Sequence, residues 1–424
     1  MALALCLATA GLNLVVDPFG IYRIATLRGF NAYKPAEYDR VRLLKAFEVE
    51  RVRPRAVVLG TSRSHIGIRV SASGWDTGAE PRYNLAFDGA TTHEMYAYLL
   101  HAQAARPLRE VVLGLDSWQL KTNPSGVRPD FDPSLLDVPD DPLRHVETRI
   151  ARLRLLFNAD TTMASLRTLT SQDPTAPDWL AADGQRLGDA FFHRPGARFS
   201  TAGPGAYFWD VDRKELGFKL DRGPPAHLRP GSASPNPDRS SLDYVGSIIA
   251  FCRANHIDLR IFITPAHAHQ MEISAIIGEW PKIEAGKRAL VRMLQEDAAW
   301  HPGAQPFPLW DFSGYSAVTI EPVPRPGSRR EMSYYWDSSH FKADVGDWIL
   351  DRLFGTAEPP RPVPPDFGMR LTPDNIDAAI ARDRVEEARY SREHPGDVAR
   401  IRALVDEVYR RIPPAQRVEI EGGR

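Results

Sequence analysis

Cysteine, net charge and nucleotide-binding motifs are scarce or absent in this sequence. Its two cysteines, Cys6 and Cys252, stand far apart in 424 residues, so we expect neither a disulfide framework nor a cysteine metal site. The formal net charge of −1 gives no basic field to attract nucleic acid, and no nucleic-acid partner is expected. No P-loop and no Gly-x-Gly-x-x-Gly motif follows a strand pattern, so the sequence predicts no cofactor.

The chain also lacks an apolar run of clearly sufficient length to cross a bilayer. The N-terminal stretch MALALCLATAGLNLVV has no charged residue before Asp17, whereas a full span needs about 20 apolar residues. We expect residues 1–22 to be a membrane anchor that holds the rest of the chain in a periplasmic or other extracytoplasmic space; a buried helix of a soluble protein and a cleaved signal are the alternatives. Five basic residues follow the stretch, and under the positive-inside rule they favour the opposite orientation: Arg23, Arg28, Lys34, Arg40 and Arg42.

Short apolar runs alternate with helical patterns, which predicts a doubly wound α/β sheet. Two runs, 56–60 and 111–115, are almost continuously apolar, as strands are when helices cover both faces of a parallel sheet. The predicted strands span 56–60, 83–86, 111–115, 259–263 and 307–311. The predicted helices lie near 36–50, 91–105, 240–255, 280–298 and 342–354.

The alternation breaks over residues 121–239. Residues 141–157 have helical apolar spacing, but the stretches 193–210 and 220–241 are rich in Gly, Pro and Ser and are expected to be loops. An insertion of this length usually forms a lid or a binding cap. We therefore expect an inserted cap over 121–239.

The cap divides one α/β domain into two parts, residues 23–120 and 240–355. A proline-rich linker and a charged helical tail follow over 356–424. We expect this tail to pack against the domain or to bind a partner rather than to take part in catalysis.

Ser62 follows the first predicted strand on a glycine turn, in the stretch AVVLGTSRSHIGI. In open α/β sheets, ligands bind beyond the carboxyl ends of the strands. A nucleophilic serine needs a base and a group that orients the base. Asp337 and His340 in the stretch YYWDSSHF supply that pair, three residues apart before the last helix of the domain. The alternative is that Asp337, Ser338 or Ser339 caps that helix.

Taken together, these motifs resemble those of the SGNH (GDSL-like) hydrolases. The block GTSR (60–63) resembles the family's serine block with Thr61 in place of Asp, NLAFDGATTHEM (84–95) resembles its glycine block, and DSSH (337–340) its Asp-x-x-His block. The resemblance covers residues 52–120 and 240–355. It implies a three-layer α/β/α sandwich with a parallel, flavodoxin-like sheet. It also implies oxyanion donors at Ser62 and Gly89.

The third block departs from the family pattern. In the stretch LGLDSW, Asp116 stands where the family has asparagine. An asparagine amide donates to a developing oxyanion, and removing such a donor costs roughly 3–4 kcal/mol. Asp116 can serve as an oxyanion donor only if burial keeps it protonated. The alternative is that it pairs with Arg63 or positions a substrate hydroxyl.

Three further residues are candidates for substrate binding. Arg63 is expected either to bind an anionic group of the substrate or to form a salt bridge. Trp336 is expected either to stack on a sugar or to pack within its loop. His267, in a loop after a predicted strand, is a candidate for contact with the substrate. His267 and His269 form a His-x-His pair, but no carboxylate or cysteine pattern nearby completes a site, so no metal is predicted.

The resemblance looks closest to a membrane-anchored cell-envelope branch that includes alginate O-acetylation proteins and the D-alanyl transfer protein of teichoic acid synthesis. It implies a serine esterase or O-acetyltransferase that acts on an acylated polysaccharide, with a membrane-bound acyltransferase as a candidate partner. A binding or scaffold component of a polysaccharide modification or export complex, with a degraded site, is the alternative.

Overall fold

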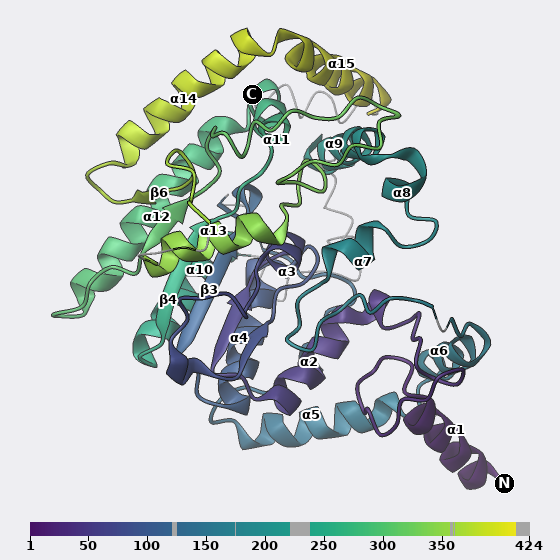
Figure 1. Cartoon of the computed structure of the whole chain (residues 1–424). Helices are drawn as coiled ribbons and strands as arrows, with labels where there is room; N and C mark the ends of the chain where they lie inside the picture. The colour runs from purple at the N-terminus through teal and green to yellow at the C-terminus, as the bar shows by residue number, and fades with distance from the viewer. Residues whose placement is uncertain (121–124, 174, 221–237, 357–358, 360, 413–424) are drawn as a thin grey trace.

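Six strands form one central sheet in the order β2-β1-β3-β4-β5-β6 (Figure 1). The strands are β1 (Ala56–Leu59), β2 (Arg82–Asn84), β3 (Glu110–Leu115), β4 (Asp258–Ile263), β5 (Leu309–Asp311) and β6 (Met369–Leu371). The first five pair in parallel, and β6 joins β5 antiparallel at the edge. The computed structural model describes residues 1–120, 125–173, 175–220, 238–356, 359 and 361–412.

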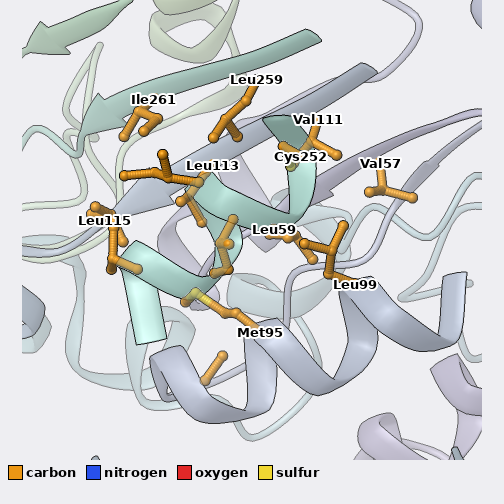
Figure 2. Packing of buried hydrophobic residues seen from close by; sticks show 14 of the residues in the cluster. Val57, Leu59, Met95, Leu99, Val111, Leu113, Leu115, Cys252, Leu259 and Ile261 are labelled. Atoms are coloured by element: carbon orange, nitrogen blue, oxygen red, sulfur yellow. The ribbon is translucent and has the colours of Figure 1, made fainter. Parts of the chain in front are cut away.

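Helices cover both faces of the sheet, which confirms the predicted α/β sandwich. One face packs against α2 (Val41–Val52), α4 (Thr92–Ala105), α10 (Ser241–Ala254), α12 (Trp280–Trp300) and α14 (Ile376–Glu393). Figure 2 shows part of this core, where strand residues such as Leu59, Leu113 and Ile261 meet Leu99 of α4 and Cys252 of α10. Alternate residues of the same strands, including Val58 and Val112, point to the other face and pack with α13 (Ala343–Phe354).

Glycines bring α3 (Ser62–Gly67) unusually close to its neighbours. A Cβ on Gly346 of α13 would lie 1.7 Å from the Gly67 carbonyl oxygen, and a Cβ on Gly67 would lie 2.0 Å from the Phe341 ring. Because only glycine permits such an approach, the serine-bearing helix rests directly on α13 and on the chain that leads into it.

The helices of the predicted cap, residues 121–239, pack in two separate places. Two of its helices, α5 (Pro142–Leu155) and α6 (Ala159–Thr170), pack with the residues around α1 (Ala2–Val16), away from the serine. Three others, α7 (Gly188–Phe192), α8 (Arg198–Ala202) and α9 (Pro204–Leu220), lie beside the chain that carries His340. Most of the predicted loop 220–241 lies outside the described residues.

The loop predicted for residues 193–210 was wrong. Residues 198–202 and 204–220 are helical, because Gly203 (φ 85°) separates two helices and Pro204 occupies the first turn of the second, where its missing amide costs nothing. Short 3-10 turns occur at Tyr38–Arg40, Thr77–Ala79, Ser117–Leu120 and Pro133–Leu135.

The C-terminal segment is an integral part of the fold. Beyond the proline-rich stretch, β6 extends the sheet, and α14 and α15 (Pro395–Arg411) pack against α12 and α11 (Ala268–Ile276). Lys287 of α12 ties this segment to the sheet by ion pairs with Asp311 at 2.6 Å and Asp383 at 3.2 Å. Residues 413–424 of the predicted tail lie outside the described part.

Within the described residues, no helix combines the length and apolar character needed to cross a membrane. Helix α1 has 15 residues, and Asn13 and Val16 near its end are buried. Met1 and the first half of the helix, residues 2–8, are exposed.

Candidate active site

Ser62, His340 and Asp337 form a continuous hydrogen-bonded chain. The Ser62 Oγ lies 2.8 Å from His340 Nε2, and His340 Nδ1 lies 2.9 Å from both carboxylate oxygens of Asp337. Ser62 begins α3 directly after the β1 turn, whereas the other two residues come from the loop before α13. The sheet thus joins residues 278 positions apart in the sequence.

Asp337 is fully buried and organises the loop around itself. Its Oδ1 accepts hydrogen bonds from the backbone amides of Ser339 at 2.8 Å and His340 at 2.9 Å. The flanking residues Tyr335 and Phe341 form an antiparallel bridge that closes the loop. Helix α13 begins only at Ala343, with Lys342 at the N-cap position, so the alternative that Asp337 or its neighbours cap this helix was wrong.

The charges of the pair fix the histidine tautomer. Burial disfavours the Asp337 carboxylate, but His340 and the two amides outweigh it and lower the pKa of Asp337. Burial likewise disfavours the imidazolium, but Asp337 outweighs it and raises the pKa of His340. Because an ionised carboxylate only accepts, Nδ1 of the neutral imidazole carries the proton. The lone pair of Nε2 is therefore directed at Ser62.

In the described part of the chain, the backbone amides of Ser62 and Gly89 have no hydrogen-bond acceptor, and the same is true of their neighbours Thr61 and Asp88. Phe87, just before Gly89, donates its amide to the Gly60 carbonyl at 3.2 Å, which holds the glycine block beside the serine turn. Gly89 has φ of 57°, in the left-handed region. The amides of Ser62 and Gly89 are suited to receive an oxyanion.

Asp116 is fully occupied as an acceptor. Its oxygens accept from the hydroxyls of Thr61 at 2.8 Å and Thr264 at 2.7 Å and from the Trp118 indole at 3.1 Å, and its Oδ1 lies 3.6 Å from Arg63 Nη1. This arrangement matches the predicted pairing with Arg63, and each of these contacts uses a carboxylate oxygen as the acceptor. The prediction of an oxyanion donor at Asp116 does not fit it.

Arg63 is buried and links three parts of the site. Besides Asp116, its guanidinium donates to Thr264 Oγ1 after β4 and to Ser339 Oγ of the histidine loop, both at 3.2 Å. The salt-bridge alternative thus describes Arg63 better than a substrate contact. Its side chain positions the loop that carries His340.

His267 has no free nitrogen for a substrate. It is 1% exposed, its Nε2 lies 2.7 Å from the Glu321 carbonyl oxygen, and its Nδ1 accepts the His269 amide at 3.3 Å. Burial lowers its pKa well below the ordinary value, so the ring is neutral. The predicted substrate contact at His267 does not fit this placement, because the ring caps α11 instead.

Trp336 is also enclosed. Its ring stacks on Phe192 of α7 at 4.9 Å and 14°, and Lys342 Nζ lies 4.3 Å from its centre. Because Phe192 and Lys342 both contact the ring, it supports the loop that carries His340. The predicted stacking of Trp336 on a sugar does not fit this placement.

Several residues that surround the triad carry no signal in the sequence. Phe192 lies 6.2 Å from the His340 ring, and Arg128 lies over Gly89, with Nη1 3.2 Å from where a Cβ would stand. Asp88, next to Gly89, pairs with the buried Arg186 at 2.6 Å. Their positions depend on how the insertion packs, which no short motif records.

Among the residues that the structure describes, one group of side chains has the composition of a metal site: Glu50, His101 and Asp137. Both ring nitrogens of His101 are already used, by the Ala46 carbonyl oxygen at 2.8 Å and by the Asp137 amide at 2.9 Å. The Arg152 guanidinium contacts Glu50. These residues thus form a structural hydrogen-bond network.

No known protein-family model matches the chain, and no curated protein is significantly similar to it. The resemblance to SGNH hydrolases therefore rests on the sequence motifs and stays a prediction.

Proposed function

We propose that this protein is a serine ester hydrolase or O-acyltransferase of the SGNH type. The observation that supports this most strongly is the chain from Ser62 Oγ through His340 to Asp337, with hydrogen-bond distances of 2.8 and 2.9 Å. A serine, a histidine with its Nε2 lone pair free and a buried carboxylate are the parts that nucleophilic acyl transfer needs.

In the first half-reaction, His340 Nε2 takes the Ser62 hydroxyl proton as Ser62 Oγ attacks the ester carbonyl. The amides of Ser62 and Gly89 donate to the resulting oxyanion. The imidazolium then gives its proton to the leaving alkoxide, and an acyl-serine is left on Ser62.

In the second half-reaction, His340 deprotonates water or an acceptor hydroxyl, which attacks the acyl-serine. The acyl group leaves as a carboxylic acid in hydrolysis or as a new ester in transfer, and the proton returns to Ser62. Ionised Asp337 stabilises the imidazolium in both halves.

The motif resemblance suggests an acylated envelope polysaccharide as the substrate. It also suggests an extracytoplasmic location, attachment to the membrane through the N-terminal segment and a membrane-bound acyltransferase as partner. These are parts of the same proposal.

The test is hydrolysis of p-nitrophenyl acetate by the full chain. Ser62→Ala and His340→Ala should each reduce the rate to background, whereas Ser71→Ala, at an exposed position after α3, should leave it unchanged. A wild-type rate no higher than that of a folded Ser62→Ala variant would contradict the enzyme proposal.

A second candidate function is favoured by Asp116. Since this acceptor stands where the family has a donor, the protein could instead be a catalytically inactive binding or scaffold component of a polysaccharide modification or export complex. Acetylated polysaccharide that co-purifies equally with wild type and Ser62→Ala, without any turnover, would favour this second function.

A further inference from the structure

Exposed apolar side chains gather at the end of the molecule formed by α1, α5 and α6, which lie together in Figure 1. We call this the α1–α5–α6 face. Leu3, Leu5 and Leu7 of α1 are 73%, 69% and 60% exposed. Soluble surfaces rarely carry large contiguous apolar patches unless these bind something.

The first half of α1 is apolar on all sides. Residues 1–8 are exposed and include no charged side chain. A helix that is apolar all round belongs in an apolar medium rather than against one flank of a protein. At about 1.5 Å per residue, this exposed half extends roughly 12 Å, which is of the order of the depth to which interfacial helices enter a bilayer.

Helix α5 carries an exposed apolar stripe. Leu143, Val146, Ile150 and Leu153 recur at spacings of three and four residues, so they share one side of the helix. All four are exposed, Leu143 at 78% and Leu153 at 59%. The opposite side carries the buried Thr148 and Arg152, which face the body.

The buried side chain of Asn13 joins α1 to this surface by hydrogen bonds. Asn13 of α1 donates to the Leu156 carbonyl at 2.9 Å and to Thr162 Oγ1 at 3.0 Å, and it accepts from Ser165 Oγ at 2.9 Å. Phe157 and Met163 are exposed next to these contacts. Asn13 thus connects α1 to the C-terminal end of α5 and to α6.

Unpaired arginines accompany the apolar surface. Arg149 and Arg154 of α5 and Arg167 of α6 are exposed, and none has an ion-pair partner among the described residues. Arginines beside apolar side chains are the composition that binds anionic lipid surfaces.

We propose that the α1–α5–α6 face docks on a bilayer containing anionic lipids. The first half of α1 enters one leaflet, the α5 stripe lies at the level of the headgroups and the arginines contact lipid phosphates. A second copy is the weaker fit, because a helix apolar on every side is only partly covered by one protein flank. The inference deepens the membrane attachment proposed above and is independent of the chemistry at Ser62.

The experiment is co-sedimentation of the full chain with vesicles of phosphatidylcholine alone or with about 30% phosphatidylglycerol. Wild type should bind the anionic vesicles more tightly, and Val146→Glu/Ile150→Glu should weaken binding by about tenfold or more, because two apolar contacts become charged. The matched control is Phe218→Glu/Val385→Glu, which changes exposed apolar residues of α9 and α14 and should bind like wild type.

Three results would overturn the proposal. The first is no sedimentation of wild type with either vesicle. The second is equal binding by the α5 variant and the control, which would leave α1 as a simple anchor. The third is a lipid-free dimer that the α5 variant abolishes without any effect on vesicle binding. Each variant must melt at a temperature like that of wild type, which verifies that it is folded. Ester hydrolysis by Ser62 is measured separately, so the membrane proposal and the enzyme proposal can fail independently.

Discussion

Asp337 performs two tasks with one side chain. Its Oδ1 holds the loop through the amides of Ser339 and His340, while both oxygens face His340 Nδ1. This double use follows from the Asp-x-x-His spacing, and the sequence therefore predicted the pair correctly. The burial of Arg63 and His267 was not predictable in the same way, because their partners, Thr264 and Glu321, come from distant segments.

Asp337→Asn tests the orientation of the imidazole. Because Asp337 raises the pKa of His340, wild-type activity should rise with pH through an apparent pKa above the ordinary histidine value of about 6.5. In Asp337→Asn, which lacks the carboxylate, this rise in activity should occur at lower pH. The value of kcat should also fall roughly 10³–10⁴-fold. The measurement is a pH–rate profile of p-nitrophenyl acetate hydrolysis. An unshifted limb with a retained rate would show that Asp337 only shapes the loop.

Asp116→Asn tests whether the family's asparagine would serve at this position. Trp118 Nε1 faces one carboxylate oxygen and Arg63 the other, and both groups only donate. Either orientation of an asparagine would therefore place its NH₂ against a donor. We expect a loss of about 1–3 kcal/mol in the free energy of unfolding and no gain in activity. A variant that is as stable as wild type and hydrolyses the ester faster would contradict this expectation. It would show that an asparagine amide can act as an oxyanion donor at this position.

At the scale of elements, β1 and β3 were the most predictable strands, because their side chains are almost continuously apolar and are buried along the whole strand. The five parallel strands lie where the apolar runs predicted them. The edge strand β6 was missed, since Met369–Leu371 is only three residues long and pairs on one side. The helices at 198–202 and 204–220 were missed because their prolines and glycines are typical of loops, although in this fold they separate and begin helices.

The crossing of α3 and α13 gives a prediction at this scale. In Gly346→Ala, the new Cβ would stand 1.7 Å from the Gly67 carbonyl oxygen, so α13 must move away from the helix that carries Ser62. We expect a lower melting temperature and a loss of esterase activity of about tenfold or more, since about 1 Å of misplacement can cost roughly 10² in rate.

Gly217→Ala is the matched control for Gly346→Ala. Nothing lies within 4 Å of a Cβ at Gly217 of α9, so this change should be neutral or stabilise the helix by about 0.5–1 kcal/mol. Equal effects of the two substitutions on the melting temperature and on activity would refute the tight crossing.

At the scale of the whole molecule, the C-terminal segment packs against the domain, which was one of the two expectations for it, whereas the insertion is divided between two regions. The tail was expected to pack or to interact, and α14 adds Ile376 and Ile380 to the main core. The insertion contributes to two separate regions, the α1–α5–α6 face and the surroundings of His340. Such long-range assignments depend on which surfaces meet, and local patterns do not encode that.

Glu110 gives a prediction for the stability of the whole fold. Burial raises the pKa of this carboxyl to about 7, so wild type loses stability as pH rises from the unfolded-state pKa of about 4.5 to 7. Glu110→Gln should therefore gain stability relative to wild type over that range, by on the order of 1–3 kcal/mol at about pH 8. Urea unfolding at about pH 5 and about pH 8 measures the difference, and a difference independent of pH would contradict burial of the carboxylate as its cause.

The most direct test of the central claim is to look for the acyl-serine itself. The full chain is mixed with p-nitrophenyl acetate, p-nitrophenol release is followed by stopped flow, and the quenched protein is examined by mass spectrometry. In wild type we expect an acetyl group on Ser62. In His340→Ala we expect Ser62 to carry no acetyl group. In Ser62→Ala we expect no acetyl group anywhere on the protein. Acetyl that appears only on other residues, or equally in all three proteins, would contradict a nucleophilic role for Ser62.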